Sequence, residues 1–145
     1  MALDELILQI EIKSLENNRF LNYSLYESGK LEVEGQIGKT NFKLLESDNR
    51  NLRDYIGKLD LSDQMYGDED ESLAPVVGIS VIKNDEQRDL LFCWDYKPNT
   101  EIANFFKLKQ LVRNVNQIAE KFVSNGKIRT VIQNASTYLK KNNYN

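Results

Sequence analysis

The chain has 145 residues, 41% of them hydrophobic and 28% charged, which is ordinary for one soluble globular domain that buries its own core. It contains no histidine and a single cysteine, so nucleophile pairs built on histidine and an internal disulfide are excluded, and zinc loses its usual ligands. The formal net charge of −3 is unevenly divided: residues 1–96 carry 20 acidic and 10 basic side chains, and residues 97–145 carry 2 acidic and 9 basic ones.

This division of charge predicts either two differently charged partners or attraction between the two parts of one fold, and we expect mainly the second. The first residues, MALDELILQIEIK, have acidic side chains where a secretory signal needs basic ones. No apolar run approaches the roughly 20 residues that are needed to cross a bilayer. We therefore expect a cytoplasmic protein without a membrane segment.

Residues 6–45 are predicted to form antiparallel strands. Apolar and polar side chains alternate along residues 6–14, 20–27 and 31–37, as they do in strands with one buried and one wet face. We expect three strands here, with residues 42–44 as a candidate for a short fourth strand.

The motif Gly38-Lys39-Thr40 resembles the end of a phosphate-binding loop, which has the pattern Gly-x-x-x-x-Gly-Lys-Ser/Thr. The first glycine of that pattern would fall on Val33, which occupies an inward position of a predicted strand. A phosphate loop also leads directly into a long helix, whereas NFKLLE follows here. We interpret residues 38–41 as a turn and predict no nucleotide site.

Residues 47–59 are predicted to form a short helix that is capped by Ser47 or Asp48. Its apolar positions recur at spacings of three and four, which gives one buried stripe: Leu52, Tyr55, Ile56 and Leu59.

Residues 60–75 are predicted to form an acidic loop. The loop lacks the alternating aspartates of a calcium site, and no second, rigidly placed acid completes a catalytic carboxylate pair. Two interpretations carry more weight, a plain solvated connection and a docking surface for a basic partner with a tyrosine as its apolar anchor. The candidate protein-binding residues are Asp63, Tyr66, Asp68, Glu69, Asp70 and Glu71.

Residues 76–96 are predicted to form a hairpin of two central strands, because apolar side chains occur on both faces. Ser80 and Lys83 match the Ser-x-x-Lys pair of acylating enzymes, but on a strand these two positions point to opposite faces. We interpret Cys93 as a small core residue, since no cation or helix start adjoins it in the sequence.

Two amphipathic helices are predicted at residues 100–124 and 127–141, each with apolar residues at spacings of three and four. The basic residues of the first helix, Lys109 among them, spread over its polar arc and do not form one stripe. Nucleic-acid binding by these helices is the alternative function that we keep. Its candidate residues are Lys107, Arg113, Lys121, Lys127, Arg129 and Lys140.

We therefore predict a single α+β domain, with an antiparallel sheet of about five strands packed against the long helix and two shorter helices beside it. The predicted function is a non-enzymatic protein-binding module, such as a regulator, an inhibitor, an immunity-type protein or an assembly partner. Its expected partner is a protein with a basic patch, and we expect no cofactor, no metal and no catalytic residue. A carboxylate- or metal-dependent enzyme is the second alternative, and homo-oligomerisation is left open.

Overall fold

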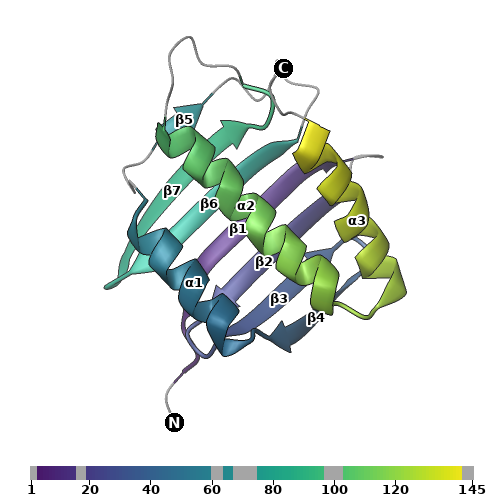
Figure 1. Ribbon diagram of the computed structural model, residues 1–145, viewed down its shortest axis with the longest axis horizontal. Helices are drawn as coiled ribbons and strands as arrows, with labels where there is room; N and C mark the ends of the chain where they lie inside the picture. The colour runs from purple at the N-terminus through teal and green to yellow at the C-terminus, as the bar shows by residue number, and fades with distance from the viewer. Residues whose placement is uncertain (1–2, 16–18, 60–63, 67–74, 97–102, 142–145) are drawn as a thin grey trace.

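The computed structural model describes residues 3–15, 19–59, 64–66, 75–96 and 103–141 (Figure 1). Within them, one sheet has the strand order β4-β3-β2-β1-β6-β7-β5. Six strands pair antiparallel, and the short β5 pairs parallel with β7 at the edge. The strands are β1 (Leu6–Leu15), β2 (Arg19–Tyr26), β3 (Lys30–Gly35), β4 (Gly38–Lys43), β5 (Gln64–Tyr66), β6 (Val76–Lys83) and β7 (Glu86–Cys93).

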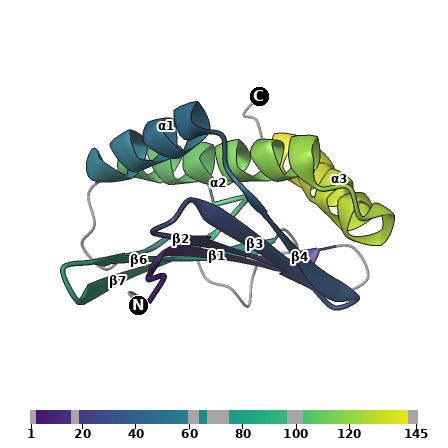
Figure 2. The same cartoon turned by 90° about the horizontal axis from the view of Figure 1, so that it is seen from below.

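Three helices lie together on one face of this sheet, and the other face carries none of the described helices (Figure 2). They are α1 (Glu46–Gly57), α2 (Ala103–Phe122) and α3 (Gly126–Lys141). The predicted α+β class and the packing of the sheet against a long helix are confirmed, with six antiparallel strands in place of about five. None of the helices in the described part of the chain is long and apolar enough to span a membrane.

The strand count differs because the Gly-Lys-Thr motif belongs to β4. The predicted turn at residues 38–41 is wrong: the turn lies at Gln36 and Ile37, and Gly38 already pairs with Gly35. Gly38 has φ +139°, a conformation that side-chain-bearing residues rarely adopt, so this hairpin depends on a glycine. Lys39 lies beside Glu32 of the neighbouring strand, with Nζ and Oε1 3.9 Å apart. The motif is therefore part of an antiparallel hairpin.

The predicted loop at residues 60–75 contains one short strand, which is a second correction. Met65 of β5 lies opposite Leu91 of β7 in parallel register. In the chain β6 lies between β5 and β7, so no hairpin joins these two strands and a parallel pairing is allowed.

Side chains from alternate positions of the strands form the core beneath the helices. Phe105 of α2 is fully buried and lies edge-on to Phe92 of β7 and to Tyr96, with both pairs of ring centroids 5.5 Å apart. The β6–β7 turn is formed by Asn84 and Asp85, whose φ values of 53° and 64° suit a two-residue hairpin loop. The predicted hairpin at residues 76–96 is thus confirmed, and Cys93 is buried in it as expected.

Buried polar side chains also join α2, α3 and the sheet. The hydroxyl of Tyr23 on β2 donates a hydrogen bond to Oδ1 of Asn116 on α2. Nδ2 of Asn116 donates to Oγ of Ser136 on α3 at 2.7 Å, and that hydroxyl donates to Glu120 at 3.0 Å. These groups fix how α2 and α3 sit on the sheet, because a buried polar atom without its partner is costly.

Helix α1 begins without a side-chain cap. Its N-cap residue is Leu45, with φ −59° and ψ 147°, and no side-chain hydrogen bond closes the first turn. The predicted capping by Ser47 or Asp48 is wrong, because the helix starts earlier, at Glu46, and both residues lie inside its first turn. Leu52 is the buried residue of this helix, and Tyr55 and Ile56 pack against the core from partly buried positions.

Replacing Leu45 by serine is expected to raise the free energy of unfolding by about 1 kcal/mol, since a serine hydroxyl at an N-cap accepts a hydrogen bond from the first turn. Leu45 already has the extended backbone of an N-cap and is 51% exposed, so little packing is lost. Urea unfolding should be compared with Leu45→Ala, which removes the same side chain without adding an acceptor. A serine variant no more stable than the alanine variant would contradict this.

Candidate functional site

A hollow on the helical face lies between α1 and α2. The two helices run side by side in opposite directions (Figure 1), so Asp48 near the start of α1 and Lys121 near the end of α2 line the same end of it. Its volume is about 430 Å³, within the roughly 300–1,000 Å³ typical of ligand sites. We call this hollow the helix groove, and its central residues are Asn51, Leu52, Tyr55, Asn114, Gln117 and Ile118.

Amide side chains dominate the polar lining of the helix groove. The side chains of Asn51 and Gln117 make no hydrogen bond to any other described residue, and both are exposed. Oδ1 of Asn114 accepts a hydrogen bond from Gln110 at 2.8 Å, which leaves its N–H donors available. Below them, Leu52 is buried and Ile118 is half-buried, so the floor is apolar. The groove therefore offers donors and acceptors above an aliphatic surface.

The two ends of the helix groove differ. At one end the hydroxyl of Tyr55 donates a hydrogen bond to the backbone carbonyl of Lys107 at 2.9 Å, which ties α1 to α2. Partial burial raises the pKa of Tyr55, so the hydroxyl stays protonated and able to donate. At the other end, Asp48 and Lys121 place opposite charges beside the opening. The ammonium of Lys121 also lies 5.3 Å from the ring of Phe122.

Local sequence explains each wall of the groove. On α1, positions 48, 51, 52 and 55 share one side because they are three or four residues apart, and on α2 positions 114, 117, 118 and 121 do the same. In each set, the polar residues flank the apolar stripe that packs on the sheet. Sequence reasoning missed the groove, because uncharged amides beside a stripe look like ordinary surface until the two helices are placed together. The signal was the amide-rich flank itself.

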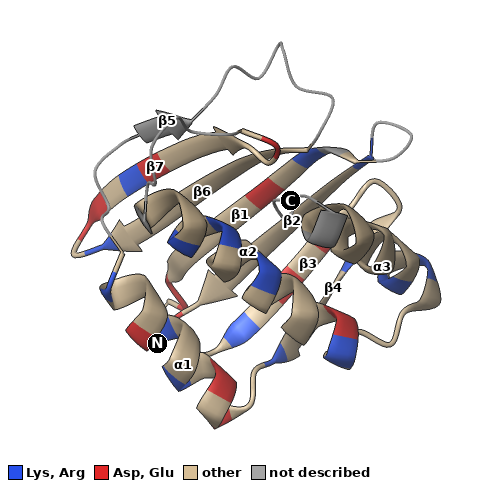
Figure 3. Cartoon of the chain, turned by 45° about the horizontal axis from the view of Figure 1, so that its top comes forward, with Lys and Arg blue, Asp and Glu red and all other residues tan. Residues whose placement is uncertain are grey.

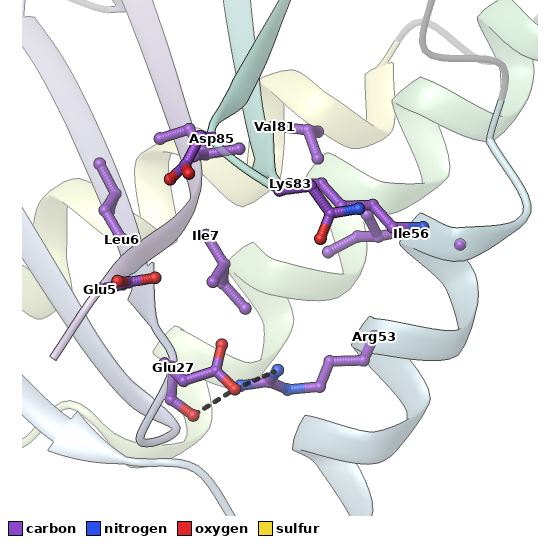
Figure 4. Close-up of a pocket in the computed structure, with 12 residues that line it drawn as sticks. Glu5, Leu6, Ile7, Glu27, Arg53, Ile56, Val81, Lys83 and Asp85 are labelled. Carbon is purple, nitrogen blue, oxygen red and sulfur yellow. Dashed lines mark hydrogen bonds and ion pairs between the residues drawn. The ribbon is translucent and has the colours of Figure 1, made fainter. Parts of the chain in front are cut away.

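A second hollow, of about 410 Å³, lies on the other side of α1, where that helix meets the ends of β1, β2 and β6 (Figure 4). We call it the sheet-end cavity. Its lining includes five aliphatic residues: Leu6, Ile7, Ile56, Val81 and Ile82. Charged side chains stand around them, and Figure 4 shows Arg53 reaching across from α1 to Glu27 at the end of β2.

Arg53 is already engaged at the rim of this cavity. One terminal nitrogen donates to the backbone carbonyl of Glu27 at 2.7 Å, and the other lies 3.5 Å from its carboxylate. Nε donates to Oδ1 of Asn49 at 3.1 Å. This arginine therefore fastens α1 to β2 and neutralises Glu27.

The predicted acidic docking loop lies mostly outside the described residues. Asp63 and residues 68–71 are not described. For Tyr66 only the backbone is described, as part of β5. Their proposed role remains a prediction.

The predicted nucleic-acid residues occupy separate places. The basic positions of α2 and α3 are distributed along the two helices rather than gathered in one patch (Figure 3). Arg113 donates to the backbone carbonyl of Leu139 at 3.1 Å and lies over the ring of Trp94, so it packs α2 against its neighbours. Lys107 and Lys121 lie toward α1, whereas Lys127 and Arg129 are exposed near the start of α3. The side chain of Lys140 is outside the described residues.

Lys109 does not lie on the polar arc of α2, where we expected it from the sequence. It is 1% exposed, and its ammonium lies 4.7 Å from the centroid of Trp94 and 5.3 Å from that of Phe105. Burial, and then the charge of Arg113, lower the pKa of Lys109 to about 8, against the attraction of Asp95. Its position four residues after Phe105 was the available signal, because such residues share a helix face.

The structure also bears on two sites that the sequence raised, the Ser-x-x-Lys pair and a metal site. Ser80 donates a hydrogen bond to Asp89 on the paired strand at 2.7 Å, and it lies on β6 as expected. Among the residues that the structure describes, no group of three cysteine or acidic side chains is placed to hold a metal ion.

Comparison of this chain with protein-family models and with curated proteins found no match.

Proposed function

We propose that this chain is a protein-binding module without catalytic activity, and that it holds an extended segment of a partner protein in the helix groove. The observation that carries this proposal is the wall of amide side chains above an apolar floor between α1 and α2. The acidic loop at residues 60–75 is a further proposed contact.

An extended polypeptide suits the chemistry of this groove. Its backbone presents N–H and C=O groups along its length, and each needs a partner when water is displaced. An amide side chain supplies both a donor and an acceptor, so Asn51 and Gln117 can meet either kind of backbone group. The apolar floor at Leu52 and Ile118 then accommodates a side chain of the partner. Backbone recognition of this kind supports a regulator, an inhibitor or an assembly partner.

The test begins with selection of binders from a library of random peptides on the wild-type protein, followed by measurement of their dissociation constants by fluorescence anisotropy. Asn114→Leu and Gln117→Leu are expected to weaken binding at least about tenfold, because each leaves backbone groups of the peptide unpaired. Leucine favours a helix as well as the amides do, so the fold is kept.

Gln133→Leu is the matched control, because Gln133 is exposed on α3 and away from the groove. It is expected to leave the affinity unchanged. The proposal fails if the library yields no binder, or if the groove variants bind the selected peptides as tightly as the control does.

A further inference from the structure

The sheet-end cavity is shaped by an irregularity in β1. The register between β1 and β2 shifts between Leu6 and Leu8, so Ile7 is an extra residue on β1. An extra residue of this kind bends its strand and re-aims a side chain. Ile7 accordingly packs against the core from a position that strict alternation would turn outward, and it stands in the middle of the cavity (Figure 4).

Some of the charged side chains around Ile7 have partners among the described residues, and others do not. Arg53 and Glu27 neutralise each other, as described above. The carboxylates of Glu5 and Asp85 form no ion pair or hydrogen bond with another described side chain, and Figure 4 shows both near Leu6. Lys83 extends toward Ile56 on the opposite side. One side of the cavity is thus acidic and open, while its floor is aliphatic.

We propose that the sheet-end cavity receives a long basic side chain, an arginine or a lysine, from the partner protein. Such a side chain has an aliphatic stem that fits against Ile7 and Ile56, and a cationic head that reaches Glu5 and Asp85. A single buried anchor of this type carries much of the binding energy in many interfaces. The inference depends on the proposed function only for the source of the side chain.

The position of the cavity relative to the helix groove supports the same partner. Asn51 and Tyr55 face α2, whereas Arg53 and Gly57 face the sheet-end cavity, so the two hollows flank α1. A partner that straddles α1 contacts both, with its backbone in one and a basic anchor in the other. This agrees with the expectation of a partner with a basic patch.

The test uses capped Gly-Arg-Gly and Gly-citrulline-Gly peptides, added to the ¹⁵N-labelled full chain and followed by amide chemical shifts. Citrulline has nearly the shape of arginine without its charge. The arginine peptide is expected to shift the amides of Ile7, Ile56 and Asn84. The citrulline peptide is expected to bind at least about tenfold more weakly, because a charge-assisted contact is lost.

Two double variants separate the cavity from general charge effects. Glu5→Gln with Asp85→Asn is expected to reduce binding of the arginine peptide about as much as citrulline does, and asparagine tolerates the positive φ at position 85. Glu11→Gln with Glu34→Gln removes two carboxylates from the helix-free face of the sheet and is expected to have no effect.

Equal binding of the two peptides, shifts confined to the amides of the helix groove, or no shift at all would overturn the inference. Gln117→Leu should leave the arginine response unchanged, because Gln117 does not line the cavity. Failure in the cavity can therefore be distinguished from failure of the groove in the peptide selection.

Discussion

Replacing Phe105 by alanine is expected to lower the free energy of unfolding by about 3–5 kcal/mol, the loss typical of a large aromatic removed from a packed core. Phe105 is 0% exposed and lies edge-on to Phe92 and Tyr96. Its removal leaves a space that α2, held on both sides, has little freedom to fill. Urea unfolding followed by circular dichroism measures the loss.

The neighbouring Phe106 is the matched control, because the same substitution there removes a ring that is 36% exposed. Phe106→Ala is expected to cost less than about 1 kcal/mol, as surface substitutions usually do. Similar losses for the two variants would contradict the packing of α2 described above.

Replacing Asn116 by leucine is expected to destabilise the protein by about 2–3 kcal/mol, because it leaves the buried hydroxyl of Tyr23 without an acceptor and removes the donor to Ser136. Asn116 accepts from Tyr23 and donates to Ser136, so one substitution breaks both contacts. Burial, with a contribution from the charge of Glu120, keeps the pKa of Tyr23 well above its usual value, so its hydroxyl stays protonated and requires an acceptor.

A double-mutant cycle with Tyr23→Phe isolates the shared contact. Once the tyrosine hydroxyl is absent, Asn116→Leu leaves one fewer unpaired group, so the double variant should be less destabilised than the two single losses added together. The expected difference is about 1 kcal/mol in thermal or urea unfolding. Strict additivity would show that the hydrogen bond contributes nothing to stability.

The alternation of apolar residues predicted most strands, and spacings of three and four predicted all three helices, because each pattern follows directly from backbone geometry. The errors occurred where local preference competes with pairing. Gly38, a residue type that is typical of turns, occupies the first position of β4. At residues 64–66, the partner strand β7 decides the conformation, and the local sequence carries no sign of it.

The candidate site was less predictable than the fold. The helix groove forms only because α1 and α2 lie beside each other. The 45 residues between Gly57 and Ala103 give no local indication that the two helices are neighbours. The sheet-end cavity depends on a register shift at Ile7 that alternation alone does not reveal. Lys109 shows the opposite case, because its helical spacing from Phe105 indicated burial, yet its charge favoured an exposed position.

The place of β1 in the middle of the sheet has a consequence for synthesis. Its neighbour β2 follows at once, whereas its other neighbour, β6, begins about 60 residues later, which takes roughly 3–12 s at ordinary rates of translation. During that interval one row of β1 backbone groups has no strand to pair with. The nascent chain therefore carries an open edge at the centre of its future sheet, and this edge is where chaperones or other nascent chains would first make contact.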